Sequence, residues 1–203
     1  MIHPKFYVAL FLPVICYRIA IAQSYKEEIK AWQKELNEHF VDENESPLGK
    51  KDRKKFNGLD FFPIDSSYRI VAQFIRTPNE LPFNMPTTTD RLPVYVKYGE
   101  VTFELKGKTV VLPLYKSQTL LDTDARMDYL FLPFTDETNG IETYGGGRYL
   151  DLEVPKSNEL IIDFNKSYNP YCAYNADYSC PIPPKENHIP VEINAGVKSW
   201  KKD

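Results

Sequence analysis

The chain has 203 residues, of which 42% are hydrophobic, 26% are charged and 14% are aromatic. This composition is typical of one globular domain, and it excludes both a disordered chain and a multi-span membrane protein. The 25 basic residues against 28 acidic ones give a net charge of -3, which excludes a general affinity for nucleic acid.

The first 22 residues have the pattern of a secretory signal peptide. Lys5 precedes an apolar run at residues 6–16, and Ala20-Ile21-Ala22 has the small-x-small pattern that signal peptidase cleaves. The run is shorter than the roughly 20 residues that cross a bilayer, although a membrane anchor is the alternative interpretation. We expect cleavage after Ala22, export to the periplasm or the outside of the cell, and no stable membrane anchor in the mature chain.

A helical arm is predicted at residues 23–58. Ser24 and Glu27 form a capping-box pattern, in which each side chain can satisfy a free backbone amide. Apolar residues then recur at spacings of three or four, as on one face of an amphipathic helix: Tyr25, Ile29, Trp32, Leu36 and Phe40. Ser46-Pro47 predicts the start of a second short helix that ends near Phe56.

From residue 59 to residue 203 the sequence is typical of β-structure. Runs rich in β-branched and aromatic residues predict strands at residues 68–75, 92–98, 101–105, 109–115, 129–134, 148–152, 160–164 and 191–194. Gly99-Glu100 and Lys106-Gly107-Lys108 separate three of them by hairpin lengths, which predicts an antiparallel meander. Strands do not alternate with helices, so a Rossmann fold is excluded. We predict a single mainly β domain, an antiparallel sandwich or open barrel, with the N-terminal helical arm packed on it.

Residues 135–188 hold the candidate functional site. Three glycines at 145–147 allow positive φ angles or a close backbone approach, and Arg148 after them can hold a carboxylate or phosphate through two parallel hydrogen bonds. Six tyrosines of this segment can form a wall that stacks on sugar rings. The candidate ligand-binding residues are Asp136, Tyr144, Arg148, Asp163, Asn165 and Asn169. Asp163 and Glu186 are the candidates for a general acid or base.

These polar residues also have a structural interpretation. Arg148 can form an internal salt bridge to Asp136 or Asp163, and the tyrosines can belong to an aromatic core whose hydroxyls are satisfied internally. An open pocket with Arg148 and two carboxylates exposed would indicate binding. Paired and sealed side chains would indicate an internal network.

Cys172 and Cys180 are the cysteines of the mature chain, and we predict a disulfide between them because export permits one. The bond would stabilise the fold by roughly 2–3 kcal/mol. The alternatives are two reduced thiols, a zinc site that includes His188, and a reactive thiol. The zinc site lacks an evident fourth ligand. Against the reactive thiol, the other histidine of the mature chain, His39, lies far away on the first helix.

Several strings of the sequence resemble one protein family. They are Phe134-Thr135-Asp136, residues 143–150, Asp163-Phe164-Asn165, residues 169–174 and residues 180–184. These strings are similar to those of the bacterial and archaeal family known as domain of unknown function sixteen-eighty-four, over nearly all of the mature chain. The resemblance implies no activity, cofactor or catalytic residue.

The sequence contains no HExxH, GxSxG or GxGxxG motif, so no metal site and no cofactor are predicted. We expect an exported domain that binds a small polar or anionic ligand through residues 135–188, and no nucleic acid. The first alternative is a structural or protein-interaction module whose polar cluster is an internal network. The second is a hydrolase-like enzyme.

Overall fold

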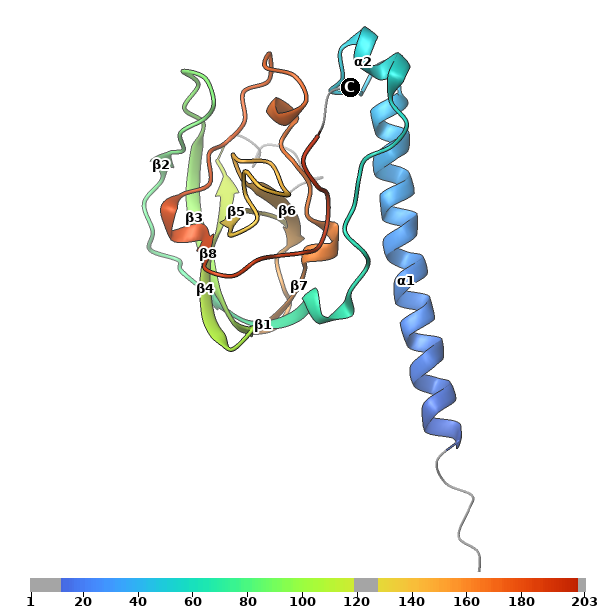
Figure 1. Ribbon diagram of the computed structural model, residues 1–203. Helices are drawn as coiled ribbons and strands as arrows, with labels where there is room; N and C mark the ends of the chain where they lie inside the picture. Colours follow the sequence, from blue (N-terminus) through green and yellow to red (C-terminus); the bar gives the residue numbers. More distant parts are fainter. Residues whose placement is uncertain (1–11, 119–127, 201–203) are drawn as a thin grey trace, which may run out of the picture.

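The computed structural model describes residues 12–118 and 128–200, with side chains from residue 23 onward (Figure 1). Within these residues two α-helices come first, α1 (Leu12–Val41) and α2 (Lys50–Lys55). The strands that follow are β1 (Arg69–Arg76), β2 (Phe83–Asn84), β3 (Val94–Leu105), β4 (Lys108–Ser117), β5 (Tyr129–Asp136), β6 (Arg148–Glu153), β7 (Glu159–Asp163) and β8 (His188–Ile189). Single turns of 3-10 helix lie at Ser66–Tyr68, Phe164–Lys166, Tyr171–Ala173 and Lys185–Asn187.

Six strands form one antiparallel sheet in the order β6-β5-β4-β3-β1-β7. The short β2 is added to β3, and β8 pairs in parallel with the end of β5. The sheet curls into a half-barrel whose edge strands are β6 and β7 (Figure 1). The predicted mainly β class with an N-terminal helix is therefore confirmed, and the open barrel is the form that the sheet takes.

The predicted turn at Gly99-Glu100 is wrong, because β3 runs through both residues. A bulge between Lys97 and Gly99 shifts the register with β4 and lets the strand bend. Glycine is required there, since a Cβ at Gly99 would lie 2.5 Å from the ring of Phe74. The predicted turn between β3 and β4 is present and consists of two residues, Lys106 and Gly107, both with positive φ.

Three further local predictions are wrong. Residues 191–194 form no strand. The helix α1 begins at Leu12, so Ser24 lies inside it and caps nothing. The second helix begins at Lys50 with Gly49 before it, and Ser46 instead donates a hydrogen bond to the carbonyl of Phe40 (2.6 Å).

The inside of the half-barrel holds the main hydrophobic core. Leu130, Leu132 and Phe134 of β5 point into it, whereas Phe131 packs with Tyr149 on the other face of the sheet. Both faces of β5 are buried at residues 130–134, which explains why these five residues are all apolar.

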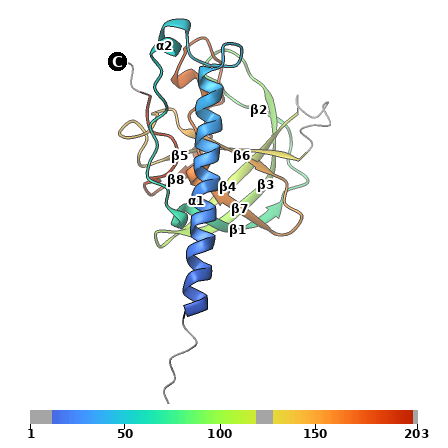
Figure 2. The same cartoon turned by 90° about the vertical axis from the view of Figure 1, so that its right-hand side faces the viewer.

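The helix α1 packs lengthwise against the β-domain, and its first turns extend past it (Figures 1 and 2). The predicted apolar stripe faces the protein: Ile29 and Phe40 are fully buried, and Trp32 and Leu36 pack against the same cluster as Phe40. Among the described residues, no helix is long and apolar enough to cross a membrane. Residues 1–11 of the predicted signal peptide lie outside the described residues, and cleavage after Ala22 stays a prediction.

Candidate functional site

Arg148 and Asp136 form an ion pair inside the protein. Both side chains have no exposed surface, and the guanidinium Nη2 lies 2.9 Å from Oδ2 of Asp136. The guanidinium also donates to the carbonyls of Ile193 (2.9 Å) and Ala195, and Asp136 accepts from the amide of Ile193 (3.1 Å). Burial lowers the pKa of Arg148, and the carboxylate of Asp136 opposes this effect. The pair thus joins β5 and β6 to the C-terminal residues.

The sequence left two interpretations of Arg148 open, a contact to a ligand and an internal salt bridge. The structure shows the internal salt bridge, to Asp136. A ligand in solution cannot reach either side chain while both are sealed. The pair therefore has a structural role, as expected if these polar residues form an internal network.

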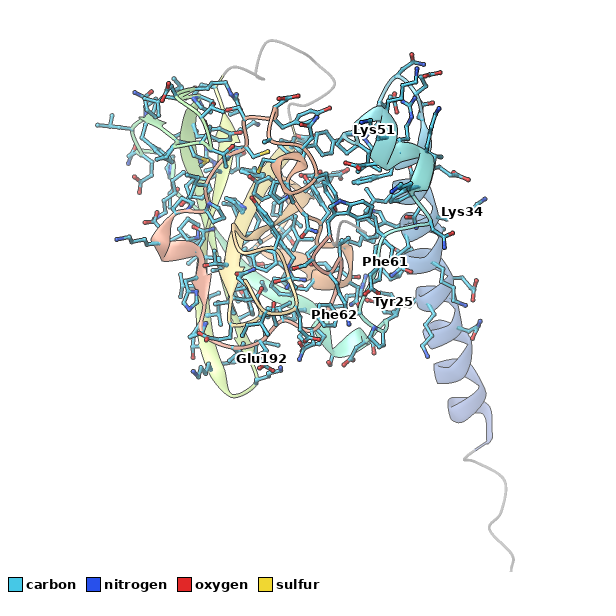
Figure 3. All side chains as sticks on the ribbon, turned by 45° about the horizontal axis from the view of Figure 1, so that its top comes forward. Tyr25, Lys34, Lys51, Phe61, Phe62 and Glu192 are labelled. Atoms are coloured by element: carbon cyan, nitrogen blue, oxygen red, sulfur yellow. The ribbon has the colours of Figure 1, made fainter. Side chains whose placement is uncertain are left out.

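Asp163 and Asn165 attach α1 to the β-domain. The hydroxyl of Tyr25 on α1 donates to the carboxylate of Asp163 at 3.0–3.1 Å, and the amide nitrogen Nδ2 of Asn165 donates to the same hydroxyl (2.9 Å). Figure 3 shows Tyr25 between the helix and the β-domain. Burial raises the pKa of Tyr25, and the charge of Asp163 adds to the increase.

The structure does not bring Glu186 and Asp163, the two candidates for acid–base chemistry, into one hydrogen-bonded cluster. Glu186 accepts a hydrogen bond from Tyr115 at 2.9 Å, and the same hydroxyl lies 3.0 Å from Oδ1 of Asn187. Burial raises the pKa of Tyr115, and the hydrogen bond to Glu186 increases it further. The predicted polar residues therefore belong to separate local clusters rather than to one pocket.

A cavity of about 740 Å³ lies between α1, the outer face of β5 and β6, and residues 168–181. Six of its lining side chains are tyrosines, so we name it the tyrosine cavity. It is lined by Trp32, Glu35, Leu36, His39, Phe40, Tyr129, Tyr149, Asp151, Tyr168, Asn169, Pro170, Tyr171, Tyr174, Tyr178, Ser179, Cys180 and Pro181. Asn169 and Cys180 are the predicted site residues in this lining.

The floor of the tyrosine cavity carries a carboxylate between two tyrosines. Oδ1 of Asp151 accepts hydrogen bonds from Tyr129 (2.7 Å) and Tyr168 (2.8 Å). Asn169 donates from Nδ2 to the carbonyl of Lys198 (2.8 Å), whereas its buried Oδ1 accepts no hydrogen bond in the described part of the chain. The cavity thus offers the carboxylate of Asp151 beside aromatic rings.

A hydrogen-bonded chain of three side chains lies at the α1 wall of the cavity. Nε2 of His39 is 2.6 Å from the hydroxyl of Tyr171, and its Nδ1 is 3.2 Å from a carboxylate oxygen of Glu45. Burial raises the pKa of Tyr171, which keeps this hydroxyl protonated. The expectation that His39 lies far from residues 135–188 is wrong, because α1 packs against this segment and the ring of His39 stacks on that of Tyr171.

The two cysteines are neighbours and both are free thiols in this structure. The amide of Cys172 donates to Sγ of Cys180 at 3.1 Å, and the hydroxyl of Tyr144 lies 3.8 Å from Sγ of Cys172. The disulfide stays a prediction. Within the described residues no group of three or more His, Cys, Asp or Glu side chains is placed to hold a metal ion, and His188 contacts Glu137 at 3.2 Å.

Asp151 and His39 were missed because each has an ordinary local context. Asp151 occupies an alternating position of a strand, and His39 lies on a helix predicted only for its apolar stripe. The abundance of tyrosine in residues 144–178 was the one signal that pointed to the cavity. It could not indicate which other elements complete the wall.

Comparison with known proteins identifies the family of this chain. The model of the family described as "Protein of unknown function (DUF1684)" matches residues 54–198. The solution NMR structure of an uncharacterised protein of Haloarcula marismortui is similar, with a TM-score of 0.68 and 29% identity over 88% of this chain and 96% of that chain. Among curated proteins none matches. The match over residues 54–198 confirms the family resemblance of the sequence, and the chain belongs to the DUF1684 family.

Proposed function

We propose that the protein binds a small, uncharged, hydroxyl-rich molecule, of which a saccharide is the type, in the tyrosine cavity. The observation that carries this proposal is the lining itself, in which six tyrosines share one cavity with the carboxylate of Asp151, and two of them bond to it. The volume of about 740 Å³ is within the range of small-molecule sites. Aromatic rings pack against the apolar faces of sugar rings, and carboxylates and hydroxyls bond to sugar hydroxyls.

The charge of the lining favours a neutral ligand over an anionic one. Glu35 and Asp151 contribute two carboxylates, and none of the described residues that line the cavity is a lysine or arginine. An anion would be repelled by this lining. Burial also raises the pKa values of Tyr149, Tyr168 and Tyr174, so these hydroxyls stay neutral at physiological pH.

The test is a titration of the protein with glucose, maltose and N-acetylglucosamine, followed by NMR chemical shifts, with glucuronic acid and glucose 6-phosphate as anionic counterparts. We expect saturable shifts with at least one neutral sugar and weaker binding of the anions. Tyr178→Ala and Asp151→Asn should each weaken that binding about tenfold or more, the value of one good contact.

Tyr98→Ala is the matched control, since Tyr98 lies on β3 outside the cavity lining and should leave affinity within about twofold. Absence of saturable shifts with all three neutral sugars would overturn the proposal. So would equal loss of affinity in Tyr98→Ala, or a preference for the anions.

We also propose that the protein is exported after removal of residues 1–22. The support is the pattern of Lys5, the apolar run and Ala22 in the sequence. The contacts of Tyr25 with Asp163 lie after this site, so cleavage would leave the attachment of α1 in place. N-terminal sequencing of the protein from periplasm and medium of a bacterial host should begin at Gln23, and recovery only from the cytoplasm with Met1 intact would contradict export.

A further inference from the structure

The two cysteines lie at the two ends of one cavity wall. Cys172 belongs to the 3-10 turn at Tyr171–Ala173, and Cys180 lines the tyrosine cavity directly. The segment between them carries Tyr174, Tyr178 and Ser179, all of which line the cavity. Any bond between the cysteines therefore closes a short loop whose side chains form the wall.

The two cysteines are in direct contact. The backbone amide of Cys172 donates a hydrogen bond to Sγ of Cys180 at 3.1 Å, so the two residues are direct neighbours. Cys180 is also held in position, because its amide donates to Oγ1 of Thr88 (3.1 Å) and its carbonyl accepts from the amide of Thr88 (2.9 Å). Closure thus requires a movement of Cys172 toward a fixed partner.

The thiols differ in their readiness to react. Cys172 is partly exposed, and hydrogen bonds from Cys180 and Tyr144 lower its pKa to about 6 although burial opposes this. Cys180 is 6% exposed, and its hydrogen bond with Cys172 and its burial raise its pKa. The first residue has the character of an attacking thiolate and the second that of a resolving thiol.

We propose that Cys172 and Cys180 form a reversible disulfide that locks the wall of the tyrosine cavity, so that the thiol redox state controls ligand binding there. The oxidant is a low-molecular-weight disulfide. The Cys172 thiolate attacks one of its sulfurs, a mixed disulfide forms and one thiolate leaves. The Cys180 thiol then loses its proton and attacks the Cys172 sulfur, which releases the second thiolate. In total, two protein thiols are oxidised and one disulfide is reduced to two thiols.

The effect on the cavity follows from preorganisation. Closing the loop removes conformations in which Tyr174 and Tyr178 leave the wall, so a ligand that needs both rings loses less entropy on binding. This part of the inference rests on the proposed saccharide binding. The formation of the bond and the stiffening of the wall do not depend on it.

The experiment uses the full chain with Cys16→Ser, so that the pair alone can react. Oxidised glutathione at neutral pH should lower the intact mass by two hydrogens, and reduced glutathione should restore it. Cys180→Ser should retain glutathione on Cys172, whereas Cys172→Ser should react at least about tenfold more slowly because Cys180 is buried. A persistent glutathione adduct without ring closure in the parent protein would overturn the proposal.

Hydrogen exchange followed by mass spectrometry measures the wall without any ligand. Oxidation should slow exchange in residues 171–180 about threefold or more and leave β3 unchanged, and Cys172→Ser should show no response to the oxidant. If the reduced and the oxidised protein exchange equally fast, the disulfide does not control the cavity, even if it forms.

If the wall stiffens, sugar affinity should rise about three- to tenfold on oxidation. If no neutral sugar binds in either state, the saccharide proposal fails, while mass and exchange still decide on the disulfide.

Discussion

The buried ion pair of Arg148 and Asp136 shows how single residues hold the loops of this fold. A charge inside a protein is stable only when a partner and hydrogen bonds replace its water. Arg148 has both, since it bonds to Asp136 and to the carbonyls of Ile193 and Ala195. The pair of strands β5 and β6 is joined at this point to Ile193, which lies 45 positions after Arg148 in the chain.

Replacing Arg148 with methionine should destabilise the protein by about 3–5 kcal/mol, because Asp136 would stay buried without its partner. Urea denaturation at pH 7 measures the change. Lys34→Met is the control, since Lys34 pairs with Glu38 at an exposed site where both side chains are more than half accessible, and should cost less than about 0.5 kcal/mol. A loss for Arg148→Met below about 1 kcal/mol would contradict a structural role.

Within the triple glycine, Gly147 is the position whose backbone angle requires glycine. Gly147 has a φ of +89°, and a Cβ there would lie 2.6 Å from the carbonyl oxygen of Phe134. Gly147→Ala should therefore destabilise the protein by about 2–3 kcal/mol. At Gly145 a Cβ would meet ordinary contacts at 3.7 Å, so Gly145→Ala should change stability by less than about 1 kcal/mol. Similar urea midpoints for the two variants would refute this difference.

At the scale of elements, α1 is joined to the β-domain at two levels. Tyr25 bonds to Asp163 and Asn165 near one end of the packed region, and Phe40 packs with Leu48 and Tyr174 near the other. Between them Trp32 and His39 form a wall of the tyrosine cavity. The position of the helix therefore decides the shape of the candidate site.

Tyr25→Phe tests this attachment, because it removes the hydroxyl and leaves the ring. We expect a loss of about 1–2 kcal/mol, the value of a hydrogen bond to a charged group in a partly exposed setting. Hydrogen exchange should accelerate in residues 25–40 but not in β1. Tyr98→Phe removes a hydroxyl on β3 as a control, and an equal acceleration in both variants would count against the role of Tyr25.

At the scale of the whole molecule, the buried tyrosines make stability depend on alkaline pH. Burial is the main cause that raises the pKa values of Tyr25, Tyr115, Tyr149, Tyr168 and Tyr174. Because the folded-state pKa of each lies above the unfolded value of about 10, the neutral tyrosines contribute fully to the free energy of unfolding below pH 10. It is lost as the pH rises through the folded-state values, because the unfolded chain releases these protons first.

We therefore expect the free energy of unfolding to fall steeply above about pH 10, with tyrosinate absorbance that appears together with loss of structure. Urea denaturation between about pH 8 and 11.5, with circular dichroism and absorbance near 295 nm, measures both. Tyr115→Phe should reduce the slope above pH 10. Complete ionisation of the tyrosines in a chain that stays folded would contradict the prediction.

The elements that the sequence predicted correctly depend on local patterns. The apolar stripe of α1, the hairpin connection around Gly107 and the strand runs each follow from the spacing of neighbouring residues. The role of Gly99 inside β3 was missed because the ring of Phe74 on β1, which leaves no room for a Cβ there, belongs to no local pattern. The start of α1 was missed for the opposite reason, since Ser24 has a capping pattern but the helix continues through it.

By itself the sequence determined the fold class, the family resemblance and the segment in which unusual residues gather. These depend on composition and on short-range periodicity, which are written in neighbouring positions. Only the tertiary structure decided which residues meet. Arg148 became part of the interior and His39 came to contact Tyr171, 132 positions away in the chain. The reason is that the tyrosine cavity exists between packed elements, and the contact between α1 and residues 168–181 is set by burial and not by sequence spacing.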